Sequence, residues 1–224
     1  MSRSRMSEHR EFWSAVAESY DHTVDLQIGG RTRALVRERL AEEGSLGRVA
    51  ELGCGTGFYT DVLASKADDV VATDFAPGML EIARTRVRAA NVTFQAEDAQ
   101  RTSFPNGRFD TAFMSLLIHF TDPRQLLAEM RRILKPGGTL IAVNLDPRAL
   151  GGLSRVQSVL RVLYRGATGY RRKPPRGFGN GVLTADELRA ILDEQRFSIR
   201  TMETIHDRSR PSYIPVEYVR ASSV

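Results

Sequence analysis

The chain has 224 residues, of which 42% are hydrophobic and 26% are charged, so its composition is that of a folded globular protein and excludes a disordered one. Its length suits one large domain, or one domain that carries an insertion. The formal net charge is +5, and the single cysteine excludes an intramolecular disulfide and any cysteine-built zinc site.

The beginning of the chain and its apolar runs indicate where the protein works. The first residues, MSRSRMSEHREF, are basic but lead into no apolar stretch, so we expect no secretory signal. The longest apolar runs have the length of a strand, which is too short to span a membrane. Together with the lone cysteine, these features favour a reducing compartment and predict a cytoplasmic protein.

Two amphipathic helices are predicted at the start of the chain. Apolar residues recur at helical spacing over residues 7–19 and again over residues 28–43. We expect residues 1–44 to contribute these helices to a lid over the substrate.

Strands and helices then alternate from residue 48 to residue 145. Short apolar runs predict strands at residues 48–52, 69–73, 92–96, 108–115 and 139–145. Helices are predicted at residues 56–66, 77–88 and 123–134. Such alternation predicts a parallel sheet that is covered by helices on both faces.

The positive charge is concentrated in the segment that follows. Residues 147–180 hold eight arginines and lysines and no acidic residue, and subtracting these eight charges from +5 leaves −3 for the rest of the chain. The same segment is rich in glycine and contains Pro174-Pro175. We interpret it as a basic cap that interrupts the domain.

The chain returns to regular structure after the cap. Thr184 and Glu187 have the spacing of a capping box, which predicts a helix that begins there. Residues 197–204 and 213–219 are expected to form two final strands, paired antiparallel. The whole chain is therefore predicted to be a single α/β domain.

A glycine-rich turn follows the first strand of the alternating region and opens the next helix. It reads ELGCGTG over residues 51–57. Glycines in such a turn let a ligand approach the backbone closely. The turn that binds nicotinamide dinucleotides has the spacing G-x-G-x-x-G, whereas the third glycine here falls one place early, which disfavours a pyrophosphate ligand.

Two aspartates follow the next two strands. Asp74 could accept hydrogen bonds from the two hydroxyls of a ribose, and Asp98 could accept one from an exocyclic amine. Either aspartate could instead serve as a turn or helix-cap residue. Because they and the glycine turn follow neighbouring parallel strands, we expect all three at the edge of the sheet where open α/β sheets bind ligands.

The order of these segments resembles that of the class I S-adenosylmethionine-dependent methyltransferases. The stretches that carry the resemblance are VAELGCGTGFYTDVLA, VVATDFAPGMLEIARTR, FQAEDAQRTSFPNGRFD, FMSLLIHFTDP and MRRILKPGGTLIAV. They lie within residues 48 to 143 and are most similar to the type 11 small-molecule group, which includes relatives of the ubiquinone and menaquinone C-methyltransferases. The resemblance implies a Rossmann-like, mostly parallel sheet of seven strands in the order 3-2-1-4-5-7-6, with S-adenosylmethionine as the methyl donor.

The resemblance also implies which residues hold the cofactor. The glycine turn would surround the methionine part, Asp74 would bind the ribose, and Asp98 would bind the edge of the adenine. The full set of expected cofactor contacts is Tyr20, Glu51, Gly53, Gly55, Gly57, Asp74, Phe75, Met79, Asp98, Ala99 and Ser115.

Two further side chains near the expected site have alternative interpretations. Cys54 lies between two glycines and is expected to be inert, because a reactive thiol needs a lowered pKa. His119 follows the fourth strand and is the candidate general base, since histidine titrates near neutral pH. The alternative is that His119 packs in the interior or lines the pocket. No histidines have metal-ligand spacing, so no metal site is predicted.

The sequence says less about the methyl acceptor. It lacks the Asn/Asp-Pro-Pro-Tyr/Phe motif of amino-methylating enzymes and the Pro-Cys nucleophile of cytosine-methylating enzymes. Residues 151–165 can form an amphipathic helix with arginines beside its apolar face. That helix could offer an apolar wall and cations to a substrate, touch an anionic membrane surface, or simply pack on the sheet.

We therefore expect methyl transfer to a small molecule that is apolar or carries an acidic group. One alternative is an RNA methyltransferase that uses the basic cap, although a single basic loop without an RNA-binding module gives it little support. The other alternative is a non-catalytic protein that binds S-adenosylmethionine.

Overall fold

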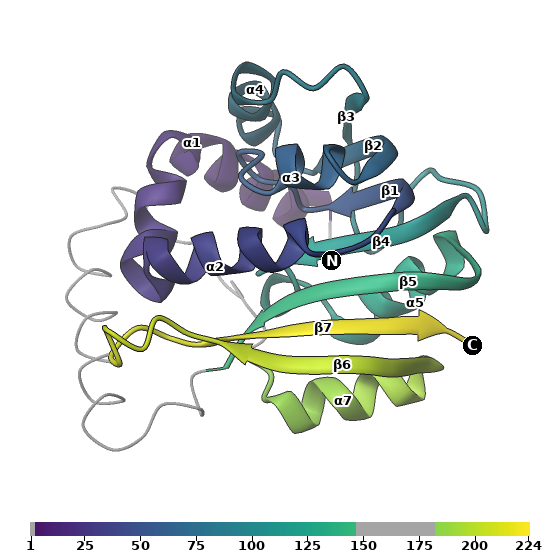
Figure 1. Ribbon diagram of the computed structural model, residues 1–224. Coiled ribbons are helices and arrows are strands. Elements are labelled where there is room, and N and C mark those ends of the chain that lie inside the picture. The colour runs from purple at the N-terminus through teal and green to yellow at the C-terminus, as the bar shows by residue number, and fades with distance from the viewer. Residues whose placement is uncertain (1–2, 147–181) are drawn as a thin grey trace.

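The computed structural model describes residues 3–146 and 182–224, which build one seven-stranded sheet (Figure 1). The strands are β1 (Gly47–Leu52), β2 (Ala67–Asp74), β3 (Val92–Ala96), β4 (Phe109–Ser115), β5 (Leu134–Leu145), β6 (Phe197–Ile205) and β7 (Val216–Ser223). Their spatial order is β3-β2-β1-β4-β5-β7-β6, which confirms the predicted order. β7 pairs antiparallel with β5 and β6, and the other pairs are parallel.

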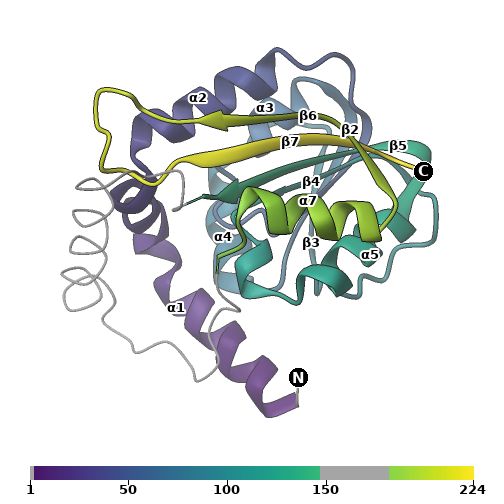
Figure 2. The same ribbon diagram turned by 90° about the horizontal axis from the view of Figure 1, so that it is seen from below.

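Helices cover both faces of this sheet. They are α1 (Arg3–Ile28), α2 (Gly30–Ala41), α3 (Thr60–Ala64), α4 (Pro77–Arg86), α5 (Pro123–Ile133) and α7 (Ala185–Glu194), with a short 3-10 helix η1 (Ile118–Phe120). α2 and α3 lie on one face, and α5 and α7 lie on the other (Figure 2). α1 lies beyond the end at which the parallel strands finish, and it packs against α4 (Figure 1).

The central strands β1, β4 and β5 carry buried residues on both sides, whereas the edge strands β3 and β6 are mostly half-buried or exposed. In β5, Ile141 and Val143 belong to the apolar cluster under α2 and α3, whereas Leu140 and Ala142 belong to the cluster under α5 and α7. This arrangement is typical of a parallel sheet with helices on both faces. A third, smaller cluster joins α1 to α4. Its buried members are Phe12, Val16, Ala17, Ala76 and Met79.

Several elements begin or end at residues other than the predicted ones. α1 extends past residue 19 because Val24 and Ile28 continue its buried face, and it ends where Gly29 adopts a φ of 84°. α3 begins at Thr60 and not at residue 56, because the glycine turn occupies the residues before it. β7 begins three residues later than predicted, since the N–H of Ile214 donates a hydrogen bond to the carbonyl of Gln27 in α1 and not to a neighbouring strand.

The capping box predicted at Thr184 is confirmed. The Thr184 hydroxyl accepts a hydrogen bond from the backbone N–H of Glu187 at 3.2 Å, and the Glu187 carboxylate accepts one from the N–H of Thr184 at 2.8 Å. These reciprocal bonds satisfy two donors that a free helix end leaves open. The helix that follows, α7, therefore begins where its sequence specifies.

The basic cap expected over residues 147–180, with its helix at 151–165, lies outside the described residues. The described segments on either side of it touch, because the side-chain amide of Asn144 donates to the carbonyl of Leu183 at 3.0 Å. Within residues 3–146 and 182–224, no helix is both long enough and apolar enough to cross a membrane.

Candidate functional site

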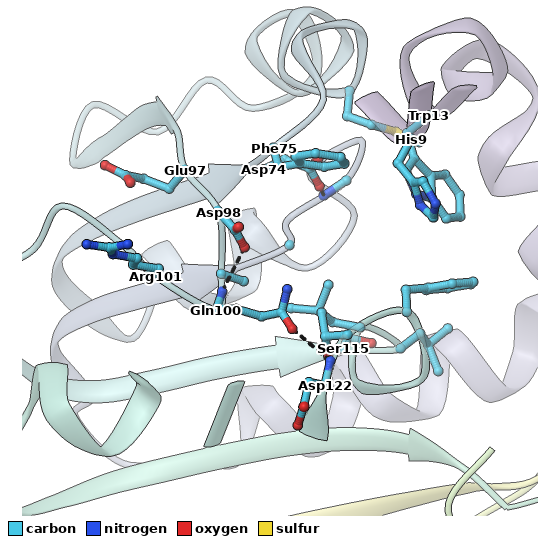
Figure 3. Close-up of a pocket in the computed structure, with 18 of the residues that line it drawn as sticks. His9, Trp13, Asp74, Phe75, Glu97, Asp98, Gln100, Arg101, Ser115 and Asp122 are labelled. Carbon is cyan, nitrogen blue, oxygen red and sulfur yellow. Dashed lines mark hydrogen bonds between the residues drawn. The ribbon is translucent and has the colours of Figure 1, made fainter. Parts of the chain in front are cut away.

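The carboxyl ends of β1, β2, β3 and β4 surround a cavity of about 610 Å³ (Figure 3). Its volume lies within the range of roughly 300–1,000 Å³ that is usual for small-molecule sites. Nine of the residues predicted to contact the cofactor line it, namely Tyr20, Gly53, Gly55, Asp74, Phe75, Met79, Asp98, Ala99 and Ser115. The topology thus brings together side chains that are far apart in the sequence.

The glycine turn presents bare backbone to this cavity. Gly53, Gly55 and Gly57 have φ values of 70°, 54° and 77°, a region of conformation that favours glycine. A β-carbon on Gly53 would lie 2.9 Å from the side chain of Leu117, which is closer than real contacts allow. A β-carbon on Gly55 would lie 3.4 Å from the Tyr20 ring. Any other residue would therefore be strained by the backbone conformation at these three positions, and at Gly53 its β-carbon would also collide with Leu117.

Asp74 is held between the glycine turn and the start of α4. One carboxylate oxygen accepts from the N–H of Gly55 and the other from the N–H of Ala76, both at 2.9 Å. Each oxygen keeps a second lone pair, so the amides orient the carboxylate and leave it able to accept from a ligand. Burial raises the pKa of Asp74, and the backbone hydrogen bonds oppose that rise.

Asp98 takes part in a short hydrogen-bonded chain along the floor of the cavity (Figure 3). Its carboxylate accepts from the N–H of Gln100 at 2.9 Å, so the turn role that the sequence left open is present. The Gln100 side chain accepts from the N–H of Asp122 at 2.7 Å, and the Asp122 carboxylate caps α5. The loop after β3 is thereby fixed to the start of α5, with both aspartates lining the cavity.

Three aromatic rings, Trp13, Tyr20 and Phe120, form one side of the cavity, and we call them the aromatic wall. The Trp13 ring centroid lies 4.9 Å from that of Phe120 and 5.8 Å from that of Tyr20, in edge-to-face contacts. Of these three rings, only Tyr20 is among the cofactor contacts expected from the sequence. Trp13 lies two turns before Tyr20 on the same helical face, which was an available signal, whereas the pairing with Phe120 depends on how α1 docks.

Two predicted contacts lie behind the cavity. Glu51 and Gly57 are not among its described lining residues. Glu51 is only 2% exposed, and its carboxylate accepts from the Thr60 hydroxyl at 2.7 Å. Burial raises the pKa of Glu51 to about 7, while the Thr60 bond lowers it and the charge of Asp74 raises it further. Glu51 therefore supports the glycine turn from the interior of the domain.

His119 also lies outside the described lining of the cavity. Its side chain is 8% exposed, and its ring centroid is 4.3 Å from that of Phe120. Burial lowers the pKa of His119 to about 4, so the ring is neutral near pH 7 and is a weak base. This position favours the packing interpretation over the general-base one. A histidine that does line the cavity is His9 of α1, which sequence analysis did not select (Figure 3).

Cys54, within the glycine turn, is buried, and its burial together with the charges of Glu51 and Asp74 raises the pKa of its thiol well above the usual value. A protonated, enclosed thiol is a poor nucleophile. The structure is thus consistent with the inert role expected for Cys54.

The hydrogen-bond acceptors and apolar side chains that line the cavity suit a nucleoside that carries an amino-acid tail. The Asp74 and Asp98 carboxylates can accept from ribose hydroxyls and from an exocyclic amine, while Phe75 and Met79 offer apolar contact to a base. The open backbone of the glycine turn leaves room for the tail. These residues fit S-adenosylmethionine.

Comparison with known proteins agrees with this fit. A family model for a methyltransferase domain, of type 11, matches residues 50–142. A demethylmenaquinone methyltransferase of Thermus thermophilus is 32% identical over 174 residues, which are 72% of this chain and 79% of that protein. A malonyl-[acyl-carrier protein] O-methyltransferase of Paenibacillus sp. is 28% identical over 99% of this chain and 81% of that protein.

A solved structure shares the fold at a lower level of sequence identity. It is described as a SAM-dependent methyltransferase from Methanosarcina mazei, with 23% identity, a TM-score of 0.63, and coverage of 84% of this chain and 96% of that chain. The strand order, the matched domain and the similarity to a relative over most of its length lead to one assignment. The chain belongs to the class I, type 11 methyltransferases, enzymes that take their methyl group from S-adenosylmethionine.

Proposed function

We propose that the enzyme methylates a small molecule whose reacting part is an apolar ring held against the aromatic wall. The observation that carries this proposal is the position of the wall, since Tyr20 lies against the glycine turn while Trp13 and Phe120 continue the same surface. Aromatic side chains supply large apolar contact areas and preferred geometries for ring partners.

The charges around the cavity support a neutral acceptor. The acidic lining residues Asp74, Glu97, Asp98 and Asp122 outnumber the basic ones among the residues that the structure describes. Arg101 lies on the side of the cavity away from Trp13 (Figure 3). Because like charges repel more strongly in a partly enclosed site than in water, an anionic acceptor would be disfavoured beside the described walls.

The roles of the side chains follow from these positions. When bound, S-adenosylmethionine supplies a methyl group on a positively charged sulfur. In our proposal Asp74 and Asp98 hold the nucleoside, and the glycine turn with Ser115 adjoins the methionine part. The aromatic wall orients the acceptor and excludes water, and positioning of this kind can contribute about 7–11 kcal/mol to a rate. Where the acceptor must lose a proton, we assign that step to His9 and not to His119.

An acceptor that carries an acidic group is the alternative to a neutral one. One relative is named for methylating malonyl-[acyl-carrier protein], which carries a carboxylate, and the basic residues 147–180 lie outside the described structure. In this alternative, the acidic group of the acceptor pairs with the arginines and the lysine of residues 147–180. The two classes differ in solubility and charge, so one experiment can separate them.

The experiment supplies the purified enzyme with S-adenosylmethionine that carries a deuterated methyl group. Parallel reactions contain a demethylated naphthoquinol in detergent micelles, malonyl-acyl-carrier protein, or RNA from the same host. We expect mass spectrometry to find the label in the quinol. Label in the malonyl thioester instead would establish the acid-bearing class, and label in RNA would overturn the small-molecule proposal.

A substitution at Asp74 provides the negative control for that assay. Asp74→Asn removes the charge but keeps the shape, and loss of a charge-assisted hydrogen bond should weaken cofactor binding by about 1.5–3 kcal/mol in calorimetry. Asp110→Asn is the matched comparison, because Asp110 also accepts from a backbone N–H, that of Arg48 at 2.9 Å, but lies at the opposite end of the sheet. If both variants bind the cofactor like the wild type, the cavity has been misassigned.

A further inference from the structure

The carboxylate of Asp21, next to Tyr20 on α1, is bound by side chains from three other parts of the fold. Arg33 of α2 donates to one oxygen at 2.8 Å, and Arg86 at the end of α4 donates to the other at 2.5 Å. The hydroxyl of Thr56, in the glycine turn, lies 3.0 Å from both oxygens. We call these four side chains the Asp21 network.

Thr56 connects this network to the glycine turn. It stands between Gly55 and Gly57, is 2% exposed, and is not among the described residues that line the cavity. Its hydroxyl donates to Asp21 and accepts from Arg86 at 2.8 Å. The turn is thus held from behind, on the side away from the cavity, by a carboxylate that belongs to α1.

Arg33 connects the network to α2. Its side chain is 3% exposed, it also pairs with Asp25 at 2.9 Å, and its guanidinium lies 3.5 Å from the centre of the Phe58 ring. A buried guanidinium of this kind depends on its anionic partners, and removing one of them is costly. Burial alone would raise the pKa of Asp21, but the hydrogen bonds and charges of Arg33 and Arg86 outweigh that effect and lower the pKa, so the carboxylate is ionised at neutral pH.

The network therefore fixes the part of α1 that faces the site. Tyr20 adjoins Asp21 in the chain and lies against Gly55, and Trp13 lies two turns earlier on the same helix. We propose that Asp21 is a positioning residue that holds α1 in register with the glycine turn, so that the aromatic wall stands in place before the cofactor binds. This inference rests on the assignment of the cavity to S-adenosylmethionine.

Substitution of Asp21 tests the proposal. In Asp21→Asn the shape is kept but the charge is lost, so Arg33 and Arg86 lose their shared anion. We expect the dissociation constant for S-adenosylmethionine, measured by calorimetry, to rise about tenfold, the effect of losing one hydrogen bond to a charged group. The chain has a single tryptophan, Trp13, so its emission reports directly on α1 and should shift to the red in the variant without cofactor.

Glu43→Gln is the matched control. Glu43 follows α2, is 7% exposed, and is likewise bound by Arg39 at 2.9 Å and by the Tyr218 hydroxyl at 3.0 Å, but it does not line the described cavity. This variant should lose a comparable part of its thermal stability. Its cofactor affinity should stay within about twofold of wild type, because distant sites act independently, and its Trp13 emission should be unchanged.

A second pair of variants keeps the proposal testable if Asp21→Asn does not fold. Thr56→Ser keeps the hydroxyl, whereas Thr56→Val keeps the size and loses the hydroxyl. We expect weaker cofactor binding in Thr56→Val and near-normal binding in Thr56→Ser. The proposal is overturned if Asp21→Asn folds, binds the cofactor with wild-type affinity and shows unchanged Trp13 emission. If Asp21→Asn does not fold, the same result in Thr56→Val overturns it. Failure of the wild-type protein to bind S-adenosylmethionine would instead refute the cofactor cavity itself.

Discussion

At the scale of single residues, burial decides which ionisable groups near the cavity can move protons. Cys54, Glu51 and His119 are all enclosed, and the uncharged form of each is favoured because burial raises the pKa of the two acids and lowers that of the histidine. Asp74 reaches the cavity but is held by backbone amides that stabilise its charge. A histidine in the cavity wall, His9, comes from the N-terminal helix and not from the loop after β4.

The buried position of His119 has a consequence for stability. The pKa of His119 is lowered from 6.5 to about 4 in the folded protein, so between these values the unfolded chain binds a proton that the folded protein does not. Stability is therefore lost as the pH falls from 6.5 towards 4. Between pH 7 and pH 5 this single group should cost about 2 kcal/mol.

Urea unfolding at pH 7 and pH 5 measures that cost. His119→Asn, which does not titrate, should lose about 2 kcal/mol less between the two pH values than the wild type loses. His22→Asn, the same substitution at an exposed position of α1, should retain the wild-type difference. Equal losses in His119→Asn and in the wild type would show that His119 titrates normally and is open to solvent.

At the scale of secondary-structure elements, the docking of α1 on α4 shapes the site. The two helices share the small cluster that contains Phe12, Val16 and Met79, and the Ser14 hydroxyl accepts from the N–H of Gly78 at 3.2 Å. A β-carbon on Gly78 would lie 2.7 Å from the carbonyl oxygen of Ser14. The close approach of these helices therefore requires the absence of a side chain at that position.

Gly78→Ala should disturb this docking. The obstructing atom belongs to the backbone, so the helices must separate, and overpacking of this kind costs about 1–3 kcal/mol. Thermal or urea unfolding measures the loss. The control is Gly30→Ala, since its new β-carbon would have only ordinary contact with Asp25 at 3.7 Å and should stabilise the helix start by about 0.4–1 kcal/mol. Equal stability of the two variants would contradict the packing argument.

At the scale of the whole molecule, residues 3–146 and 182–224 by themselves build the seven-stranded sheet. The Thr139–Leu145 part of β5 pairs with β7, and Asn144 and Leu183, one on each side of residues 147–181, are joined by a hydrogen bond of 3.0 Å. The described parts of the chain that come before and after residues 147–181 therefore lie close together at this point.

Replacement of residues 148–180 by a short glycine-serine linker should leave a folded protein. Because the described cofactor cavity is intact, its affinity for S-adenosylmethionine should remain within about twofold of the full-length value in calorimetry. Methyl transfer to the acceptor should fall, if the cap takes part in acceptor binding as its sequence suggests. Loss of folding or of cofactor binding in this variant would show that the segment belongs to the core of the domain.

The sequence by itself indicated the strands and helices of the sheet, and its resemblance to the methyltransferases implied the strand order that the structure shows. Periodic apolar runs and local turn residues define strands and helices, and the glycine turn, Asp74 and Asp98 each follow a strand, so the parallel topology alone brings them to one edge. The ends of α1, α3 and β7 could not be predicted from the sequence, because contacts with other parts of the chain determine them. The glycine turn at residues 51–57 and the capping box at Thr184 could be predicted because each depends only on neighbouring residues.

The tertiary structure alone decided which residues surround the site from outside the sheet. Asp21 and Arg86 are 65 positions apart, and nothing in either local sequence marks them as partners. Nothing in the local sequence marks Trp13 and Phe120 as partners either. Nor does it indicate that His9, and not His119, is among the described residues that line the cavity. The physical reason is that these contacts depend on how whole helices pack, whereas the sheet edge follows from the direction of its strands.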